Sequence, residues 1–260
     1  MIDGKISIDV VLLGPPASGK GTVVSYFLDK YNWNAIVPGD IYRKIRDEDS
    51  DLGALVRESL ERYHHCPDDL TNRIIHKAVD DCLKINQLLD LPNSRFVFDG
   101  YPRSFEQLDY LDKNFNVSAF IHLDAPIETT LAAAINRRYC SGCNKVFSKQ
   151  SPPKITGPNI SCIDGEASRP YLTNTCLENE AQWLSCSDSC AATSENNWIT
   201  RWDDSEEKYY ERISAFNQNT LPVIEAISQR PNYKKFQIIG NDKGLSEIED
   251  WLNAVLGNNC

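Results

Sequence analysis

A short apolar run that leads into a glycine-rich loop and then a helix constrains this chain more than any other feature. Ile8–Leu13 is rich in β-branched residues, as a buried parallel strand usually is. It is followed by Gly14-x4-Gly19-Lys20, and the residues from Lys20 to Tyr31 have helical spacing. This is the phosphate-loop arrangement, in which backbone N–H groups and the positive end of the helix surround phosphate oxygens. We therefore expect a nucleotide-phosphate site here, with Lys20 as a mobile positive charge.

Strand-like and helix-like runs alternate along most of the chain. The other expected strands are Phe96–Phe98, Ala119–Leu123 and Phe236–Ile239. The other expected helices are Leu52–Tyr63, Asp69–Ile85, Phe105–Phe115, Thr129–Arg138, Asp203–Arg230 with a break at Pro222, and Leu245–Leu256. This order predicts an α/β fold with a parallel sheet that helices cover on both faces.

Length and charge narrow the class of protein further. The chain has 260 residues and a net charge of -10, which fits one large domain or one domain with an insertion. The acidic balance argues against general binding to DNA or RNA, because that affinity comes mostly from clustered Lys and Arg. No segment approaches the roughly 18 apolar residues of a membrane helix, and the first apolar run is too short for a signal peptide. We expect an intracellular, cytoplasmic protein that binds neither nucleic acid nor membrane.

The segment from Tyr139 to Thr200 breaks the alternation. It is rich in Pro, Gly, Ser and Asn, shows little periodicity, and holds six of the nine cysteines. A structureless loop of this length is implausible inside a compact domain. We therefore predict a small inserted domain with its own means of stabilisation.

Arginines are the second candidate group of functional residues. Phosphoryl transfer between nucleotides gathers many negative oxygens, so catalysis consists mainly of positioning and charge neutralisation. An acceptor that is already an ionised phosphate needs no general base. The candidates from separate elements are Arg43, Arg103, Arg137, Arg138, Arg201 and Arg212.

Several motifs together resemble one family of enzymes. In Gly19-Lys20-Gly21-Thr22 the hydroxyl comes one residue later than in the strict phosphate-loop pattern. The other motifs are Gly39-Asp40-x-x-Arg43, Asp99-Gly100-Tyr101-Pro102-Arg103 with Gln107 four residues later, and Arg201-x-Asp203-Asp204 with Arg212 eleven residues after Arg201. This combination resembles the nucleoside monophosphate kinases, and the adenylate kinases above all, over nearly the whole chain outside the insertion.

The resemblance implies roles for individual residues. The implied ATP-binding residues are Gly14, Ala17, Ser18, Gly19, Lys20, Gly21, Thr22 and Arg137. The implied AMP-binding residues are Gly39, Asp40, Arg43, Gly100, Arg103, Gln107, Arg201 and Arg212. The implied catalytic residues are Lys20, Arg103, Arg137, Arg201 and Arg212. Asp99, at the end of a strand, is expected to orient Mg²⁺ and its waters.

The resemblance also implies a fold and a reaction. The expected fold is a P-loop kinase with a five-stranded parallel sheet, made of residues 1–138 and 201–260. An acceptor-binding arm would span about 38–68, and the lid would span 139–200. The expected reaction is the Mg²⁺-dependent transfer ATP + AMP ⇌ 2 ADP by a monomer. The alternatives are a kinase for another nucleoside monophosphate, a small-metabolite kinase, and a nucleotide- or metal-sensing protein without turnover.

Two residues depart from the family pattern at positions that contact bases. Pro38 stands where most adenylate kinases have Thr before the Gly-Asp pair, so a hydroxyl near the acceptor adenine is missing. Ala133 stands four residues before Arg137, where the family has an Arg that stacks on the donor adenine. These departures favour relaxed base specificity, or stacking by Trp202. Gln107 is retained, and its amide can offer a donor and an acceptor to adenine.

The cysteines of the lid predict a metal. Cys140-x-x-Cys143 and Cys186-x3-Cys190 are short pairs, which suit tetrahedral Zn²⁺ because a turn presents two thiolates to one ion. Some bacterial members of the resembled family have a four-cysteine zinc site in the lid. We therefore predict structural zinc on Cys140, Cys143, Cys186 and Cys190, and Cys162 or Cys176 could replace one of the last two. A disulfide-stapled lid and free thiols are the alternatives.

Overall fold

A computed structural model describes residues 5–31, 33–63, 66–89, 95–140, 146–148, 155–156, 159–160, 198–201, 203–237 and 242–257. The strands are β1 (Ile6–Leu13), β2 (Asn34–Ile36), β3 (Phe96–Asp99), β4 (Phe115–Asp124), β5 (Arg137–Cys140), β6 (Val146–Ser148), β7 (Ile155–Thr156), β8 (Asn159–Ile160), β9 (Trp198–Ile199) and β10 (Tyr233–Gln237). The α-helices are α1 (Lys20–Tyr31), α2 (Pro38–Arg46), α3 (Asp51–Tyr63), α4 (Asp68–Leu88), α5 (Phe105–Asn114), α6 (Ile127–Asn136), α7 (Glu206–Ala215), α8 (Leu221–Ile227) and α9 (Asp242–Leu256).

Five strands form one parallel sheet in the order β10-β4-β1-β3-β2. The predicted five-stranded parallel sheet is confirmed. After β1 the chain fills one side of the sheet with β2 and β3, and it then crosses β1 to place β4 and β10 on the other side. The carboxyl end of β1 therefore lies at the point where the strand order reverses, which is where open α/β sheets bind ligands.

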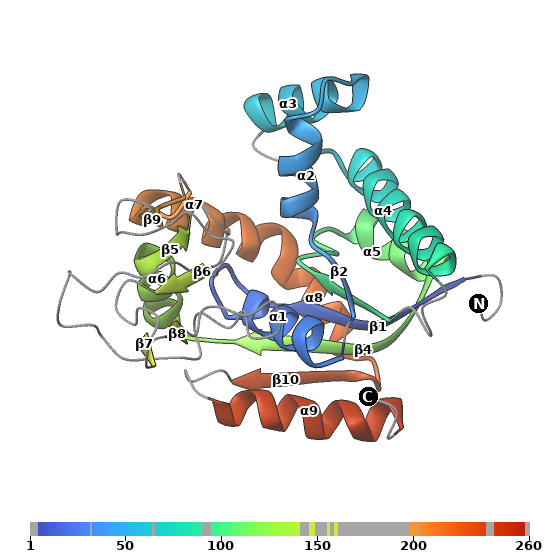
Figure 1. Ribbon diagram of the computed structural model, residues 1–260, viewed down its shortest axis with the longest axis vertical. Helices are drawn as coiled ribbons and strands as arrows, with labels where there is room; N and C mark the ends of the chain where they lie inside the picture. Colours follow the sequence, from blue (N-terminus) through green and yellow to red (C-terminus); the bar gives the residue numbers. More distant parts are fainter. Residues whose placement is uncertain are drawn as a thin grey trace.

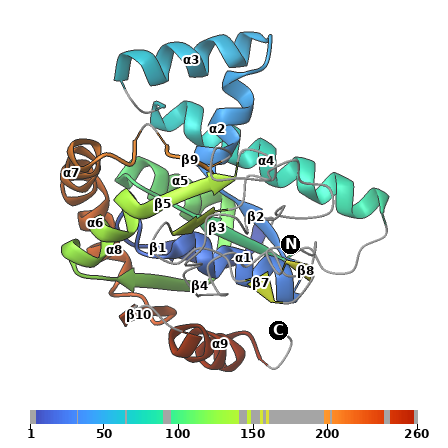
Figure 2. The ribbon, with the colours of Figure 1, turned by 60° about the vertical axis from the view of Figure 1, so that its left-hand side comes forward.

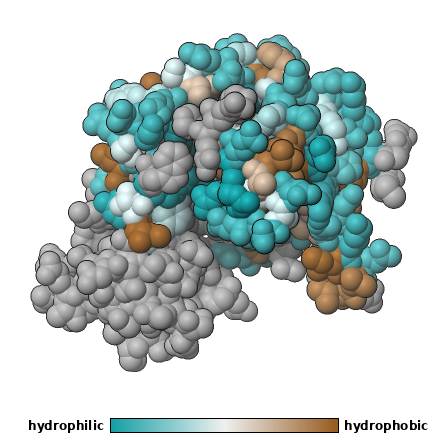
Figure 3. Space-filling view, turned by 90° about the horizontal axis from the view of Figure 1, so that it is seen from above, coloured by the Kyte–Doolittle hydropathy of each residue, from teal (hydrophilic) through white to brown (hydrophobic). Residues whose placement is uncertain are grey.

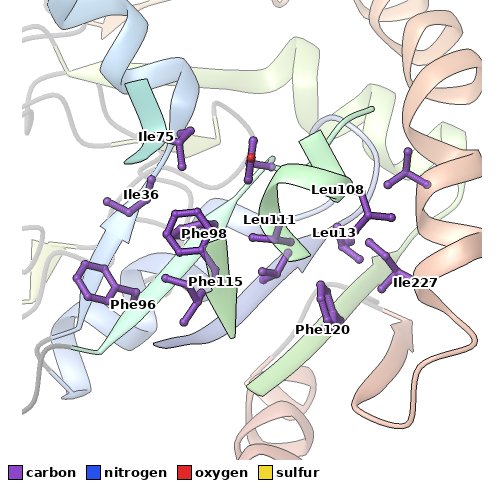
Figure 4. Close-up of a cluster of buried hydrophobic side chains, with 14 of the residues drawn as sticks. Leu13, Ile36, Ile75, Phe96, Phe98, Leu108, Leu111, Phe115, Phe120 and Ile227 are labelled. Carbon is purple, nitrogen blue, oxygen red and sulfur yellow. The ribbon is translucent and has the colours of Figure 1, made fainter. Parts of the chain in front are cut away.

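Helices cover both faces of this sheet (Figure 1). One face packs against α4, α5 and α8, and side chains such as Ile75, Leu111 and Ile227 meet strand residues such as Phe98 there (Figure 4). The opposite face packs against α1 and α9, where Phe27 and Leu252 are among the buried residues. Successive residues of β1 alternate between the two clusters, as the pleat of a strand requires.

The helices α2 and α3 form an arm that stands away from the sheet. In Figures 1 and 2, α3 and α9 lie at opposite ends of the molecule. Among the coloured residues on the face seen from above in Figure 3, most are hydrophilic. Pro38 is the first residue of α2, where its fixed φ and missing N–H are compatible with a helix. The arm packs against the start of α4 through a small cluster that includes Val56, Cys66 and Ile74.

The end of α6 differs from the sequence prediction. The helix ends at Asn136, and Arg137 is already extended, with φ −66° and ψ 135°. Arg137 to Cys140 form β5, which pairs antiparallel with β6 and with β9. The prediction that the two arginines end the helix was therefore wrong. Arg137 pairs with Ser148 of β6, and local helical spacing does not reveal such strand pairing.

The region of Pro222 also differs from the predicted helix break. Phe216–Thr220 form a π-helical turn between α7 and α8, and the N–H of Leu221 donates to the carbonyl of Phe216. Pro222 lies in the first turn of α8, where it needs no N–H partner. The long helix therefore continues through the proline. Among the described helices, none is long and apolar enough to cross a membrane.

Candidate active site

The loop between β1 and α1 approaches the neighbouring strand closely. Gly14 has φ 142°, and a Cβ on it would lie 2.4 Å from the carbonyl oxygen of Leu123 at the end of β4. Only glycine fits this approach. Gly19 has φ 89°, and Ala17 adopts the left-handed region with φ 60°, which is uncommon for a residue with a side chain. These turns wrap the loop around the amino end of α1, as the phosphate-loop motif predicts.

Lys20 extends back along this loop. Its Nζ donates to the carbonyls of Gly14 at 2.9 Å and Pro15 at 2.8 Å, and to the Ser18 hydroxyl at 3.4 Å. Burial lowers the pKa of Lys20 to about 8, because the ammonium loses hydration, while the charge of Asp99 opposes that shift. Arg103, Arg212 and Arg137 also lower the pKa, so positive charges from three other segments act on Lys20.

The sheet brings Asp99 to the same place. Leu12 of β1 pairs with Asp99 of β3, so the loops that follow these two strands are neighbours. Burial raises the pKa of Asp99, while the charges of Lys20 and Arg103 pull it down. Desolvation by itself would favour a neutral acid, and the cations beside it favour the carboxylate. A carboxylate oxygen at this position is a ligand type that Mg²⁺ accepts.

Three of the predicted arginines gather around two buried carboxylates. Arg137 donates through Nε to Asp204 at 2.8 Å and through a second nitrogen to the other oxygen of the same carboxylate. Arg201 binds Asp203 in the same two-fold manner, at 2.7 and 2.8 Å. Arg212 lies 3.3 Å from Asp203 and 3.5 Å from Asp204. The two acids are 7% and 2% exposed, while the side chains of Arg137, Arg201 and Arg212 are 18%, 27% and 30% exposed, so the acidic part of this group is the buried part.

This arrangement leaves a net positive charge close to Lys20. Asp203 and Asp204 carry two negative charges against the three guanidinium groups. The acidic pair holds the arginines in place, because each Arg–carboxylate contact with two parallel bonds fixes the guanidinium plane. The sequence motif contains Asp203 and Asp204, but the sequence did not predict a role for them. Their position two and three residues after Arg201 was the available signal.

The three other predicted arginines lie outside this arginine group. The Nε of Arg103 donates to the carbonyl of Gly100 at 2.7 Å, and its guanidinium is exposed. Arg43 lies on the arm, is exposed, and pairs with Asp40 of its own helix. Arg138 is not part of the arginine group, because its guanidinium donates to the carbonyls of Ile135 and Arg137.

The predicted zinc site cannot be placed from the structure. Cys143, Cys186 and Cys190 lie outside the described residues, as do Cys162 and Cys176, and only the backbone of Cys140 is described. Trp202 also lies outside them. Within the described part of the chain, no cluster of three or more His, Cys, Asp or Glu side chains forms a metal site.

The pKa of Lys20 predicts how substrate capture depends on pH. An ammonium with a pKa of about 8 loses its proton as the pH rises from about 7 to 9, and the uncharged amine attracts phosphate less. Because kcat/KM reports the free enzyme, we expect kcat/KM for a nucleoside triphosphate to fall above pH 8, by up to about tenfold per pH unit. A pH profile of initial rates at low triphosphate checks this. A profile that stays flat to pH 10 would show that Lys20 keeps its proton.

Comparisons with known proteins identify the family of the chain. The family model for adenylate kinase matches residues 12–232. Among curated proteins, an adenylate kinase of Thermosipho africanus is 30% identical over 256 residues, which cover 95% of this chain and 99% of that protein. An adenylate kinase of Mesomycoplasma hyopneumoniae is 28% identical over 94% of this chain and 97% of its own length. With the phosphate loop, Asp99 and the arginine group placed as described, the chain belongs to the adenylate kinase family of phosphotransferases.

Proposed function

We propose that this protein catalyses the reversible, Mg²⁺-dependent transfer ATP + AMP ⇌ 2 ADP. The observation that carries the proposal is that Lys20, at the start of α1, lies near Asp99, at the end of β3, while two buried acids hold Arg137, Arg201 and Arg212. Positive groups fixed in advance stabilise the charge that develops on a transferring phosphoryl group. The family membership supports the same reaction.

On the donor side, the proposal assigns ATP phosphates to the loop. The backbone from Gly14 to Thr22 and the ammonium of Lys20 would hold the triphosphate, and Arg137 would reach the transferring group. Asp99 would hold Mg²⁺ through its waters, since a partly buried carboxylate beside a phosphate-binding lysine is chemically suited to that ion. Bound Mg²⁺ would neutralise charge on the phosphates and align them.

On the acceptor side, the proposal assigns AMP to residues of α2 and of the segment that follows β3. Arg43 and Arg103 are exposed and would bind the monophosphate, together with Arg201 and Arg212. Gly39 and Asp40 lie in the first turn of α2, and Asp40 is close enough to Asp99 for its charge to raise that pKa. Gln107 would read the base.

We also propose the division into moving parts. Residues 1–138 and 201–260 would form the core, about 38–68 the arm, and 139–200 the lid. Closure of the arm and the lid would exclude water, so that ATP transfers its phosphoryl group to AMP and not to water. A monomer and a cytoplasmic location stay predictions from the sequence.

A panel of acceptors and donors tests the specificity that Pro38 and Ala133 put in question. With ATP as donor, we expect AMP to give a kcat/KM at least about tenfold above UMP, CMP and GMP. With AMP as acceptor, we expect GTP and other triphosphates to replace ATP in part, because Ala133 stands where the family has an arginine that stacks on the donor base. A preference for UMP or CMP would favour the alternative of a pyrimidine monophosphate kinase. No turnover with any acceptor would favour a sensor.

Zinc in the lid is a separate proposal that the cysteine spacing supports. We expect the purified protein to carry about one zinc per chain, bound by Cys140, Cys143, Cys186 and Cys190. Removal of the metal by a chelator should release the lid before the core unfolds, since the metal replaces a hydrophobic core in so small a unit. Metal analysis and protease sensitivity within 139–200 check this. A protein without metal, in which all thiols titrate in the native state, would contradict it.

A further inference from the structure

The side-chain amide of Gln107 has two partners that fix its orientation. Its oxygen accepts the backbone N–H of Arg103 at 2.8 Å, and its nitrogen donates to an oxygen of Asp68 at 2.6 Å. A backbone N–H can only donate, and a carboxylate can only accept. If the amide turned over, two donors would face each other at one end and two acceptors at the other. The contacts therefore exclude the flipped amide.

Asp68 is itself held in place by a further hydrogen bond. Its second oxygen accepts the hydroxyl of Ser104 at 2.7 Å, and that hydroxyl oxygen accepts the backbone N–H of Gln107 at 3.1 Å. One turn along α4, Asn72 accepts the hydroxyl of the buried Tyr101 at 2.7 Å. Two residues on one face of α4 thus form hydrogen bonds with the segment from Tyr101 to Gln107. Asp68 is the one that binds the amide of Gln107.

The orientation of an amide determines which bases it can read. After these two bonds, Gln107 still has one lone pair on its oxygen and one hydrogen on its nitrogen. Adenine offers the complementary pair, an exocyclic amine that donates beside a ring nitrogen that accepts. A 6-oxopurine offers the reverse pair, which only the flipped amide could match. Gln107 is 6% exposed, so a base reaches only a narrow edge of it.

We propose that Asp68 is a positioning residue that makes the site selective for a 6-aminopurine over a 6-oxopurine, by locking the amide of Gln107. This rests on the proposed function, in which Gln107 reads the acceptor base. In this role Asp68 does not touch the base, because it acts through the amide of Gln107. Its neighbour Asp69 is exposed and shares the first turn of α4, so it is a matched control for the loss of a negative charge at that helix end.

The kinetic test compares AMP with IMP, which differs at position 6 of the base. For Asp68→Ala we expect the ratio of kcat/KM for AMP to that for IMP to fall roughly tenfold, with the KM for ATP unchanged. Asp68→Asn keeps a carbonyl that can accept from Gln107, so it should restore the ratio to within about threefold. Asp69→Ala should behave as the unmodified protein. An unchanged ratio in folded Asp68→Ala would overturn the proposal.

A second readout does not depend on catalysis. In the ¹⁵N-labelled protein, the side-chain amide signal of Gln107, assigned by its loss in Gln107→Ala, should exchange its protons slowly. Asp68→Ala should accelerate that exchange roughly tenfold, and Asp69→Ala should not. If the protein fails to phosphorylate AMP, the proposed function is contradicted. This measurement still shows whether Asp68 fixes the amide of Gln107. Fast exchange in the unmodified protein would overturn the lock even in an active enzyme.

Discussion

Replacing Lys20 with methionine is expected to lower kcat/KM for ATP and AMP by about 10³-fold, with little loss of fold stability. Methionine keeps the length and apolar stem of the side chain but removes the ammonium. That ammonium donates to two loop carbonyls and lies among the charges of Asp99 and three arginines. Initial rates over a range of both substrates, together with the thermal unfolding midpoint, measure the two effects separately.

Lys84→Met is the matched control for this variant. Lys84 is an exposed lysine of α4 with no part in the proposed site, so its loss should leave kcat/KM within about twofold. A Lys20→Met enzyme that keeps a tenth or more of the activity would contradict the placement of phosphate on this loop. A large fall in its unfolding midpoint would instead make Lys20 a structural residue.

Replacing Asp204 with alanine is expected to destabilise the protein by about 3 to 5 kcal/mol, and to lower the unfolding midpoint by roughly 10 °C. Asp204 is 2% exposed and accepts hydrogen bonds from two nitrogens of Arg137, with Arg212 at 3.5 Å. Without it, Arg137 becomes a charge in a nearly buried site with no partner of its own. Activity should fall as well, because the guanidinium plane is no longer fixed. Thermal and urea unfolding measure the stability.

An exposed ion pair of the same kind provides the control. Asp112 accepts two nitrogens of Arg230 at 2.8 and 2.7 Å, but its side chain is 45% exposed. Asp112→Ala should cost no more than about 1 kcal/mol, because water replaces the lost contact. Equal destabilisation by the two variants would mean that burial of the acidic pair contributes nothing to the arginine group.

Local patterns predicted the core and the phosphate loop well. The run Ile8–Leu13 lies within β1, and α1 begins at Lys20 and ends at Tyr31 as the spacing indicated. These elements are determined by features close in sequence, namely an apolar strand, a turn that only glycine can form, and a helix with one buried face. The resemblance also singled out Lys20 and Asp99, which the pairing of β1 with β3 brings together, and Arg137, whose charge acts on Lys20.

Features that depend on distant partners were missed or mistaken. Helical spacing extended α6 through Arg137, but that residue pairs with Ser148 of β6, and β9 then pairs with Tyr139 and Cys140 further along the same strand. Asp68 and Ser104 lie 36 residues apart, and the contact that holds Gln107 exists only because α4 packs against α5. The short strand β2 carries only three residues, and their apolar pattern is too brief to indicate a strand.

Product analysis from one reaction mixture tests the central claim most directly. Equimolar ATP and AMP with Mg²⁺ and the protein should yield ADP by consuming both substrates in equal amounts, without release of inorganic phosphate. ADP supplied alone should reach the same final mixture from the other side, because the reaction is reversible. Chromatographic separation of the three nucleotides with a phosphate assay gives both quantities. Release of phosphate while AMP stays constant would contradict the account, since it would identify an ATPase.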